Sequence, residues 1–235
     1  MTQQTDQPPQ TDRAPNRLDR RKARTRAALV QAAQAFIAAG QVNVPILEIT
    51  QAADVGLGSF YNHFDSKEQL FEAAVEDALD AYGAVLDEHS VGLDDPAEAF
   101  AQSFRLTGRL HRRQPELSKV LLRSGLTLAS SDRGLAPRAR RDLESAARAG
   151  RFSIRDPDLA LAIVAGAALC LAQLLHDHPD RDDAESADLI TEDLLRMFGL
   201  PADQAHEISR QPLPDLDNLP RRSPEGAATT PPGHG

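Results

Sequence analysis

The chain has 235 residues, a formal net charge of −9 at pH 7 and a single cysteine, Cys170. This length allows one or two domains with a substantial core, and one cysteine excludes an intramolecular disulfide framework. No charged segment followed by an apolar run opens the sequence, so we expect no signal peptide and a cytoplasmic protein.

The acidic charge is unevenly distributed along the sequence. Residues 17–64 contain six basic and three acidic residues, a local charge of +3 that leaves −12 for the rest of the chain. Because salt screens charges over about 8 Å, a nucleic acid responds to this basic segment and not to the whole-chain charge. The overall negative charge therefore does not exclude DNA binding.

The two ends of the sequence differ in composition from its middle. Residues 1–16 are almost free of apolar side chains, and residues 201–235 contain seven prolines. We expect a disordered tail over 1–16 and a Pro-rich, loosely attached tail over 201–235. The folded part is then expected within 17–200.

The first predicted helix covers residues 19–39 and ends at Gly40, because its apolar residues recur at helical spacing. A helix-turn-helix follows over residues 46–64. Ile46 and Ile49 give its first helix an apolar face, and the residues Asp54-Val55-Gly56 are typical of a turn.

The second helix of this pair is expected to begin near Leu57. Phe60 and Phe64 are four residues apart and should point inward. The residues left to face outward are Leu57, Ser59, Asn62 and His63, with Tyr61 at the edge. Such a face suits a groove of DNA.

The segment Gly58-Ser59-Phe60-Tyr61-Asn62-His63-Phe64, followed by Ser66-Lys67-Glu68, resembles the signature of the TetR/AcrR family of one-component bacterial transcriptional repressors. The specific match covers about residues 24–71. The resemblance implies phosphate contacts from Arg24, Thr25, Tyr61, His63 and Lys67, and base reading by Leu57, Gly58 and Ser59. The full set of expected DNA-binding residues is Arg24, Thr25, Thr50, Gln51, Leu57, Gly58, Ser59, Tyr61, Asn62, His63 and Lys67.

Three positions depart from the family pattern. Val44-Pro45 stands where a capping Thr is usual, Leu47 replaces a frequent Arg, and Leu57 replaces a polar or basic residue. We expect a small loss of helix stability and of salt-dependent affinity, and Leu57 leaves the base preference open. Packing of Tyr61 at a rim, and a solvated face over residues 20–26, are the alternatives to phosphate contact.

Further helical patterns continue to residue 200, and none of them carries a strand signal. Their predicted ranges are 66–89, 96–113, 115–129, 135–149, 157–176 and 184–198, the last with a Schellman ending at Gly199 and Leu200. The predicted fold is therefore all-α with about nine helices. A three-helix DNA-binding domain over 17–65 precedes a helical effector-binding and dimerisation domain over 66–200.

The second domain is expected to hold a small-molecule effector between facing helices. Our candidates for the polar and aromatic lining of this pocket are Phe104, Thr107, His111, Ser124 and Gln173. A satisfied core histidine is the alternative for His111. Arg105, Arg109 and Arg112 form a separate stripe, which we interpret as a solvated face.

The segment Leu159 to Leu175 is apolar on all sides but shorter than a membrane span, so we expect a buried helix and no membrane association. A second copy of the chain is its simplest cover, through a bundle of the last two helices. The expected dimer contacts are Leu159, Ile163, Ile190, Leu194 and Phe198. Cys170 lies in this run and is expected to be a small core residue.

Other site classes find little support in the sequence. His176 and His178 would not share a helical face, so we expect no metal site there, and no nucleophile or phosphate-loop motif occurs. We therefore expect neither catalysis nor a cofactor. The leading hypothesis is a homodimeric repressor that is released from a pseudo-palindromic operator by a small molecule. The alternative is a receptor or scaffold of the same fold that has lost specific operator binding.

Overall fold

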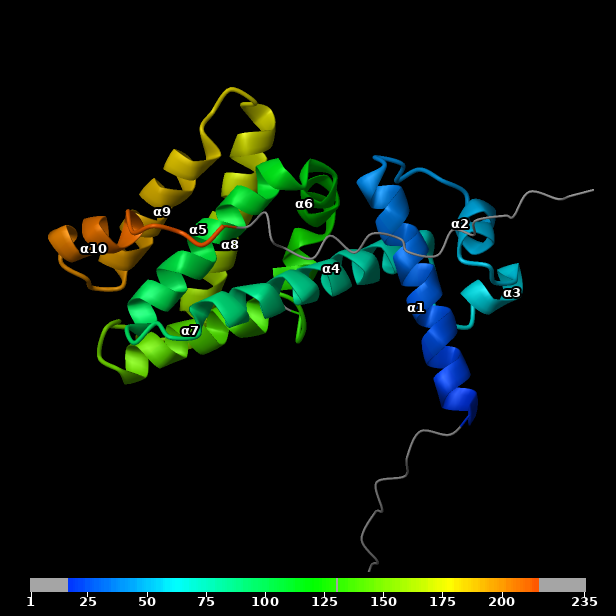
Figure 1. The fold of residues 1–235 in the computed structure, drawn as a ribbon, viewed down its shortest axis with the longest axis horizontal. Helices are drawn as coiled ribbons and strands as arrows, with labels where there is room; N and C mark the ends of the chain where they lie inside the picture. The colour runs from blue at the N-terminus through cyan, green and yellow to red at the C-terminus, as the bar shows by residue number, and fades with distance from the viewer. Residues whose placement is uncertain (1–16, 130, 216–235) are drawn as a thin grey trace, which may run out of the picture.

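The computed structural model describes residues 17–129 and 131–215, without the side chains of residues 124–129. Every regular element in this part of the chain is a helix, so the predicted all-α class is confirmed (Figure 1). The ten helices are α1 (Arg17–Ala38), α2 (Ile46–Ala52), α3 (Leu57–Phe60), α4 (Lys67–Ser90), α5 (Pro96–Arg113), α6 (Pro115–Ala129), α7 (Ala136–Arg148), α8 (Pro157–Asp177), α9 (Asp183–Met197) and α10 (Ala202–Ser209).

The helices α1, α2 and α3 form one end of the molecule, and α4 leads from them along the remaining helices (Figure 1). With 24 residues, α4 is about 36 Å long. Leu29, Ile49 and Phe60 of the first three helices share one core with Leu70 of α4 and Leu117 of α6. Helix α6 therefore joins the body to the helix-turn-helix end.

Several helix ends have the geometry that their sequences predict. The Ser66 side chain caps α4 by accepting a hydrogen bond from the Gln69 N–H at 3.1 Å. At the end of α9, Gly199 has a φ of +102° and the Leu200 N–H donates to the Leu195 carbonyl at 3.1 Å. This bond confirms the predicted Schellman ending. Pro45 precedes α2 without a side-chain cap, as expected.

The arginine stripe of α5 packs against the C-terminal part of the chain, and Arg105 in it is buried, which contradicts its interpretation as a solvated face. Arg105 is 4% exposed, and its Nε donates to Asp188 Oδ1 of α9 at 2.8 Å. Arg109 Nη2 donates to the same oxygen at 2.8 Å. Arg112 instead donates to the His178 carbonyl at 2.7 Å, at the end of α8. The spacing on α5 could not reveal the acidic residue on α9 that makes this burial possible.

Residues 202–215 are folded against the body, so the predicted C-terminal tail was wrong for this segment. The body has a second hydrophobic core, formed by residues of α5, α7, α8 and α9. Ala205 and Ile208 of α10 are buried in this second core. The chain then returns over α5, where Arg105 Nη1 donates to the Gln211 carbonyl at 2.7 Å. The Gln211 amide donates to Glu98 Oε1 at 2.8 Å. The prolines after α10 do not continue the helix, but the chain still packs against the body. The remaining predicted tail residues, 1–16 and 216–235, lie outside the described part of the chain.

Candidate functional site

The helix-turn-helix is built around a tight turn between α2 and α3. Asp54 has a φ of +52°, a left-handed conformation that Asp tolerates better than most residues. The Val55 N–H donates to the Thr50 carbonyl at 3.0 Å, and the Val55 side chain packs against the first core. The turn thus fixes the angle at which α3 leaves α2.

The segment 57–64, which begins with α3, buries two phenylalanines and exposes the opposite face. Phe60 is fully buried and Phe64 is 3% exposed, with ring centroids 6.0 Å apart. The α-helix ends at Phe60, earlier than expected, although the N–H groups of His63 and Phe64 still donate to the Phe60 carbonyl. The exposed residues are Leu57, Gly58, Tyr61 and Asn62, while Ser59 and His63 are half-buried.

Thr50 does not belong to the DNA-facing surface, and its predicted role is corrected. Its side chain is 1% exposed, and its hydroxyl donates to the Leu47 carbonyl at 2.9 Å within α2. Gln51, the next residue, is exposed and remains available for contact with a base. At this exposure the Thr50 side chain is out of reach of a base edge.

Basic residues of α1 lie beside the recognition segment, which is α3 with the residues that follow it to Phe64. The Arg26 guanidinium is 5.2 Å from the centre of the Phe64 ring, a cation–π distance. Burial lowers the pKa of His63, and the charges of Arg26 and Lys22 lower it further. His63 is therefore neutral at pH 7 in the free protein and offers a hydrogen bond, not a charge. Three predicted phosphate-binding residues lie outside this segment. Arg24 on α1 is exposed, whereas Thr25 on α1 and Lys67 at the start of α4 are half-buried.

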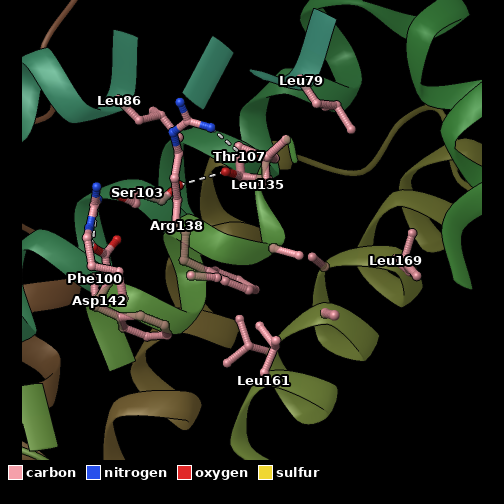
Figure 2. Close-up of a pocket in the computed structure, with 18 of the residues that line it drawn as sticks. Leu79, Leu86, Phe100, Ser103, Thr107, Leu135, Arg138, Asp142, Leu161 and Leu169 are labelled. Carbon is pink, nitrogen blue, oxygen red and sulfur yellow. Dashed lines mark hydrogen bonds and ion pairs between the residues drawn. The ribbon is translucent and has the colours of Figure 1, made fainter. Parts of the chain in front are cut away.

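A cavity, partly open to solvent, lies in the body between α4, α5, α6, α7 and α8 (Figure 2). Its volume is about 120 Å³. An apolar cavity of about 150 Å³ binds benzene, so this partly open space is of the size that one small aromatic ring needs. The apolar side chains that line it include Leu79, Leu86, Phe100, Phe104, Leu121, Leu135, Leu161, Val164 and Leu169.

Three of the expected pocket residues, Phe104, Thr107 and His111, line this cavity from α5. Gln173 does not: it is exposed on α8, and its amide donates to Asp177 at 2.8 Å, so that prediction is corrected. The side chain of Ser124 lies outside the described part of the structure. The periodicity that placed Gln173 on a helix could not tell which face turns inward.

The polar edge of the cavity was not predicted. Figure 2 shows Arg138 and Asp142 of α7 on one side of the cavity and Leu169 of α8 on the other. Arg138 bonds to two carboxylates of α4, with Nη1 2.6 Å from Asp80 Oδ1 and Nε 2.9 Å from Asp87 Oδ2. Arg141 Nη2 bonds to Asp87 at 2.7 Å and to Asp142 at 2.9 Å. The helical spacing of 138, 141 and 142 was a signal for a shared face of α7.

The two carboxyl groups of this edge titrate in opposite directions. Burial acts to raise the pKa of Asp87, but hydrogen bonds from Arg141 and Arg138 outweigh burial and hold that pKa below its usual value. Burial raises the pKa of Asp142, and the nearby charge of Asp87 raises it too, so that the opposing effects of Arg141 and Arg138 do not bring it back to its usual value. The edge therefore combines cationic donors with a carboxyl group that accepts a proton more readily than usual. These groups suit a ligand that carries hydroxyls.

The outer face of α8 and α9 exposes large apolar side chains. Leu159 is 64% exposed, Ile163 46% and Met197 49%. Cys170 is also exposed on this face of α8, which corrects its expected place in the core. Within the described part of the chain, α8 is the one helix whose length and composition would allow it to cross a membrane, yet its other face packs into the body with residues such as Leu171.

Two of the five expected dimer residues are instead inside the subunit. Leu194 is 5% exposed and Phe198 is 4% exposed, both in the second core, so they cannot contact a second copy. Ile190 is half-buried and also packs against that core. The exposed apolar residues of α9 are Leu189 and Met197.

This arrangement defines a class of protein: a helix-turn-helix joined by one long helix to a helical domain with a cavity. Residues 28–74 match the model for bacterial regulatory proteins of the tetR family, and residues 95–211 match that for the tetracyclin repressor-like C-terminal domain. The crystal structure of RolR in complex with the ligand resorcinol is 35% identical, with a TM-score of 0.68, over 84% of this chain and 98% of that chain. The chain belongs to the TetR family of transcriptional regulators.

Two further solved structures are similar to this one. RolR without ligand is 36% identical over 81% of this chain and 99% of that chain, with a TM-score of 0.64. The transcriptional regulator FadR from Bacillus subtilis, in complex with stearoyl-CoA, has 14% identity and a TM-score of 0.52 over 73% of this chain and 96% of that chain. At this identity the likeness to FadR shows the fold alone. The sequence has no match among the curated proteins.

Proposed function

We propose that this protein is a homodimeric repressor that binds a pseudo-palindromic operator in the cytoplasm and is released by a small hydroxylated aromatic effector. The observation that carries the proposal is the place of the cavity against α4. Arg138 at the cavity edge is bonded to Asp80 and Asp87 of α4. The same helix begins at Lys67, directly after the recognition segment. A ligand at this edge thus acts on the helix that positions α3.

The class of effector follows from the cavity. Its lining is mainly apolar, its volume of about 120 Å³ suits one aromatic ring, and its polar groups gather at one edge. Hydroxyl groups can donate to Asp87 or Asp142 and accept from Arg138 or Arg141. The relative with 35% identity binds resorcinol, a ring with two hydroxyls, which supports the same class here.

The dimer is supported by the exposed apolar face of α8 and α9. Leu159 and Ile163 on α8, with Leu189 and Met197 on α9, expose large apolar side chains whose burial is favourable. Two copies joined by this face through a two-fold axis bury it in a four-helix bundle. The two recognition helices then need half-sites about one helical turn, roughly 34 Å, apart or a multiple of it.

Release requires that the effector prefers the DNA-free form. A ligand shifts an equilibrium only by the difference between its affinities for the two states. A hydroxyl that competes with Asp80 or Asp87 for Arg138 loosens the link between α7 and α4, and α4 then changes the spacing of the two recognition helices. Because coupling is reciprocal, operator DNA must weaken resorcinol binding by the same factor that resorcinol weakens DNA binding.

Fluorescence anisotropy with a labelled duplex from the protein's own upstream region tests the proposal. We expect salt-sensitive binding that resorcinol reverses. Arg138→Ala should still bind the duplex but need a higher resorcinol concentration for release. The matched control is Arg140→Ala on the same helix, whose partner Asp158 lies on α8 and not on α4. Equal responses in the two variants would contradict the role given to Arg138.

The second candidate, a receptor or scaffold of this fold without operator binding, is favoured by one observation. Leu47 and Leu57 are 53% and 47% exposed on the helix-turn-helix, where apolar side chains add no phosphate contact. Resorcinol binding without affinity for any upstream duplex would select this candidate over the repressor.

A further inference from the structure

His111 lies at the end of the row of α5 residues that faces the cavity. Phe100, Phe104, Thr107 and His111 all line it and follow helical spacing. From Phe100 to His111 the row is about 16 Å long at 1.5 Å per residue. His111 therefore lies well along α5 from Phe100, and its ring contacts Ser118 of α6.

One nitrogen of the His111 ring is satisfied and the other is not. Nδ1 lies 3.0 Å from Ser118 Oγ of α6, within hydrogen-bond distance. His111 is 5% exposed, and its Nε2 atom is fully buried. This nitrogen has no hydrogen-bond partner among the described residues. A buried polar atom without a partner is unfavourable, and most such atoms in proteins are hydrogen-bonded. Because His111 lines the cavity, a ligand that reaches Nε2 there supplies the missing partner.

The protonation state of the ring restricts what this partner can be. Burial lowers the pKa of His111 to about 4, so the ring is neutral at pH 7. A neutral imidazole offers no opposite charge to a carboxylate or to an ammonium group. The ligand group at this point is therefore uncharged.

The tautomer of the ring narrows the group further. If Nδ1 donates to Ser118 Oγ, Nε2 is an acceptor; if the Ser118 hydroxyl donates to Nδ1, Nε2 carries the proton and donates. A carbonyl fits only the second case, because it accepts a hydrogen bond but cannot donate one. A hydroxyl both donates and accepts, so it satisfies Nε2 in either case.

We propose that His111 is an effector-binding residue, which bonds through Nε2 to a hydroxyl on the aromatic ring of the effector. This inference rests on the proposed effector class and adds to it a second polar anchor. The arginine and aspartate edge of α7 holds one side of the ligand, and His111 holds another. Between the two anchors the ligand is apolar, as the leucine and phenylalanine lining requires.

Calorimetric titration with two matched probes tests this assignment. Resorcinol and 1,3-dimethylbenzene have the same shape, but the second has methyl groups in place of both hydroxyls. We expect the preference of the wild-type protein for resorcinol to fall about tenfold in His111→Phe, because one buried hydrogen bond is lost. His176→Phe, at an exposed position near the end of α8, is the matched control and should keep the wild-type preference.

A direct measurement on the wild-type protein does not depend on how His111→Phe folds. With ¹⁵N-labelled histidine, addition of resorcinol should shift the Nε2 resonance of His111, and 1,3-dimethylbenzene should not produce the same shift. An unchanged preference in a folded His111→Phe, or an unshifted Nε2 resonance at saturating resorcinol, would overturn the assignment. Failure of the wild-type protein to bind resorcinol would overturn the effector class and this inference together. Binding of resorcinol through His111 without release from DNA would overturn only the repressor mechanism.

Discussion

Arg138 of α7 lies directly across Gly83, in the middle of α4. A Cβ atom at position 83 would stand 2.5 Å from Arg138 Cδ and 2.6 Å from its Nε, closer than real side chains approach. The absence of a side chain at Gly83 thus lets the guanidinium reach Asp80 on one side and Asp87 on the other. This contact joins the candidate effector cavity to the helix that carries the recognition segment.

Gly83→Ala should therefore weaken effector binding with little change in stability. Alanine favours the helix by about 1 kcal/mol, whereas displacing partly exposed ion pairs costs about as much. We expect the free energy of unfolding to change by less than about 1 kcal/mol in urea titrations. Resorcinol affinity should fall to the level of Arg138→Ala. The double variant should be no weaker than either single variant, and additive losses would show that Gly83 acts by another route.

Neutral His111 makes the protein sensitive to acid. Its pKa is about 4 when folded and 6.5 at its ordinary value, so the unfolded chain takes up the proton first as the pH falls. The stability due to the neutral ring is present above pH 6.5 and is lost as the pH falls toward 4. Between pH 7 and pH 5 this loss is about 2 kcal/mol.

Urea unfolding at pH 7 and pH 5 measures this term as a difference between variants. His111→Phe should lose about 2 kcal/mol less than the wild-type protein over this range, since it has no ring to protonate. His176→Phe should follow the wild-type protein. Parallel profiles of His111→Phe and wild type would exclude His111 as the source.

Asp188 holds two arginines in the core between α5 and α9. Arg105 and Arg109 both bond to its Oδ1 at 2.8 Å. Asp188→Ala leaves the buried Arg105 without its counter-charge and should destabilise the protein by about 3 to 5 kcal/mol. Asp193→Ala, on an exposed position of the same helix, should change stability by less than about 0.5 kcal/mol. Equal losses of stability in Asp188→Ala and Asp193→Ala, measured by urea titration, would contradict the stabilising role of the Asp188 ion pairs.

The sequence was informative where a property depends on neighbours in the chain. Helical spacing and the residues typical of helix ends predicted the fold class. Ser66 caps the start of α4 and Gly199 follows the end of α9, as expected. The TetR family was also recognised from local residues, because the helix-turn-helix is a continuous segment. Local patterns are sufficient for such features, since capping and turn chemistry involve residues a few positions apart.

Features that depend on distant residues could not be predicted in this way. Asp188 is 83 residues from Arg105, so α5 alone suggested a solvated stripe. Arg138 reaches Asp80 across 58 positions, and the polar edge of the cavity was missed. The spacing of α2 did not show that Thr50 is buried, because the residues that cover it come from other helices. Periodicity shows that a face is shared, but not what covers it.

The exposed apolar face should control the oligomeric state. Ile163→Glu and Met197→Glu place a charge where two copies would meet, and burying an unpaired charge is costly. Light scattering at micromolar concentration should give twice the chain mass of 25.5 kDa for the wild-type protein and the single mass for both variants. Val91→Glu, at an 84% exposed residue after α4, is the control. A wild-type monomer would remove the dimer from the proposal.

Substitutions in the helix-turn-helix should distinguish the residues that contact phosphates from the residues that read bases. Lys67→Ala should weaken binding to all duplexes and make the salt slope shallower by about two units per dimer, because phosphates carry no base information. Leu57→Lys, Ser59→Ala and Gln51→Ala should instead change which duplex is preferred, at about 1 to 3 kcal/mol for each discriminating contact. Anisotropy titrations on a set of operator variants at several salt concentrations measure both effects. If the Leu57, Ser59 and Gln51 variants lose affinity equally on every duplex, base reading lies elsewhere, and the exposed Asn62 becomes the first candidate, since Thr50 is buried.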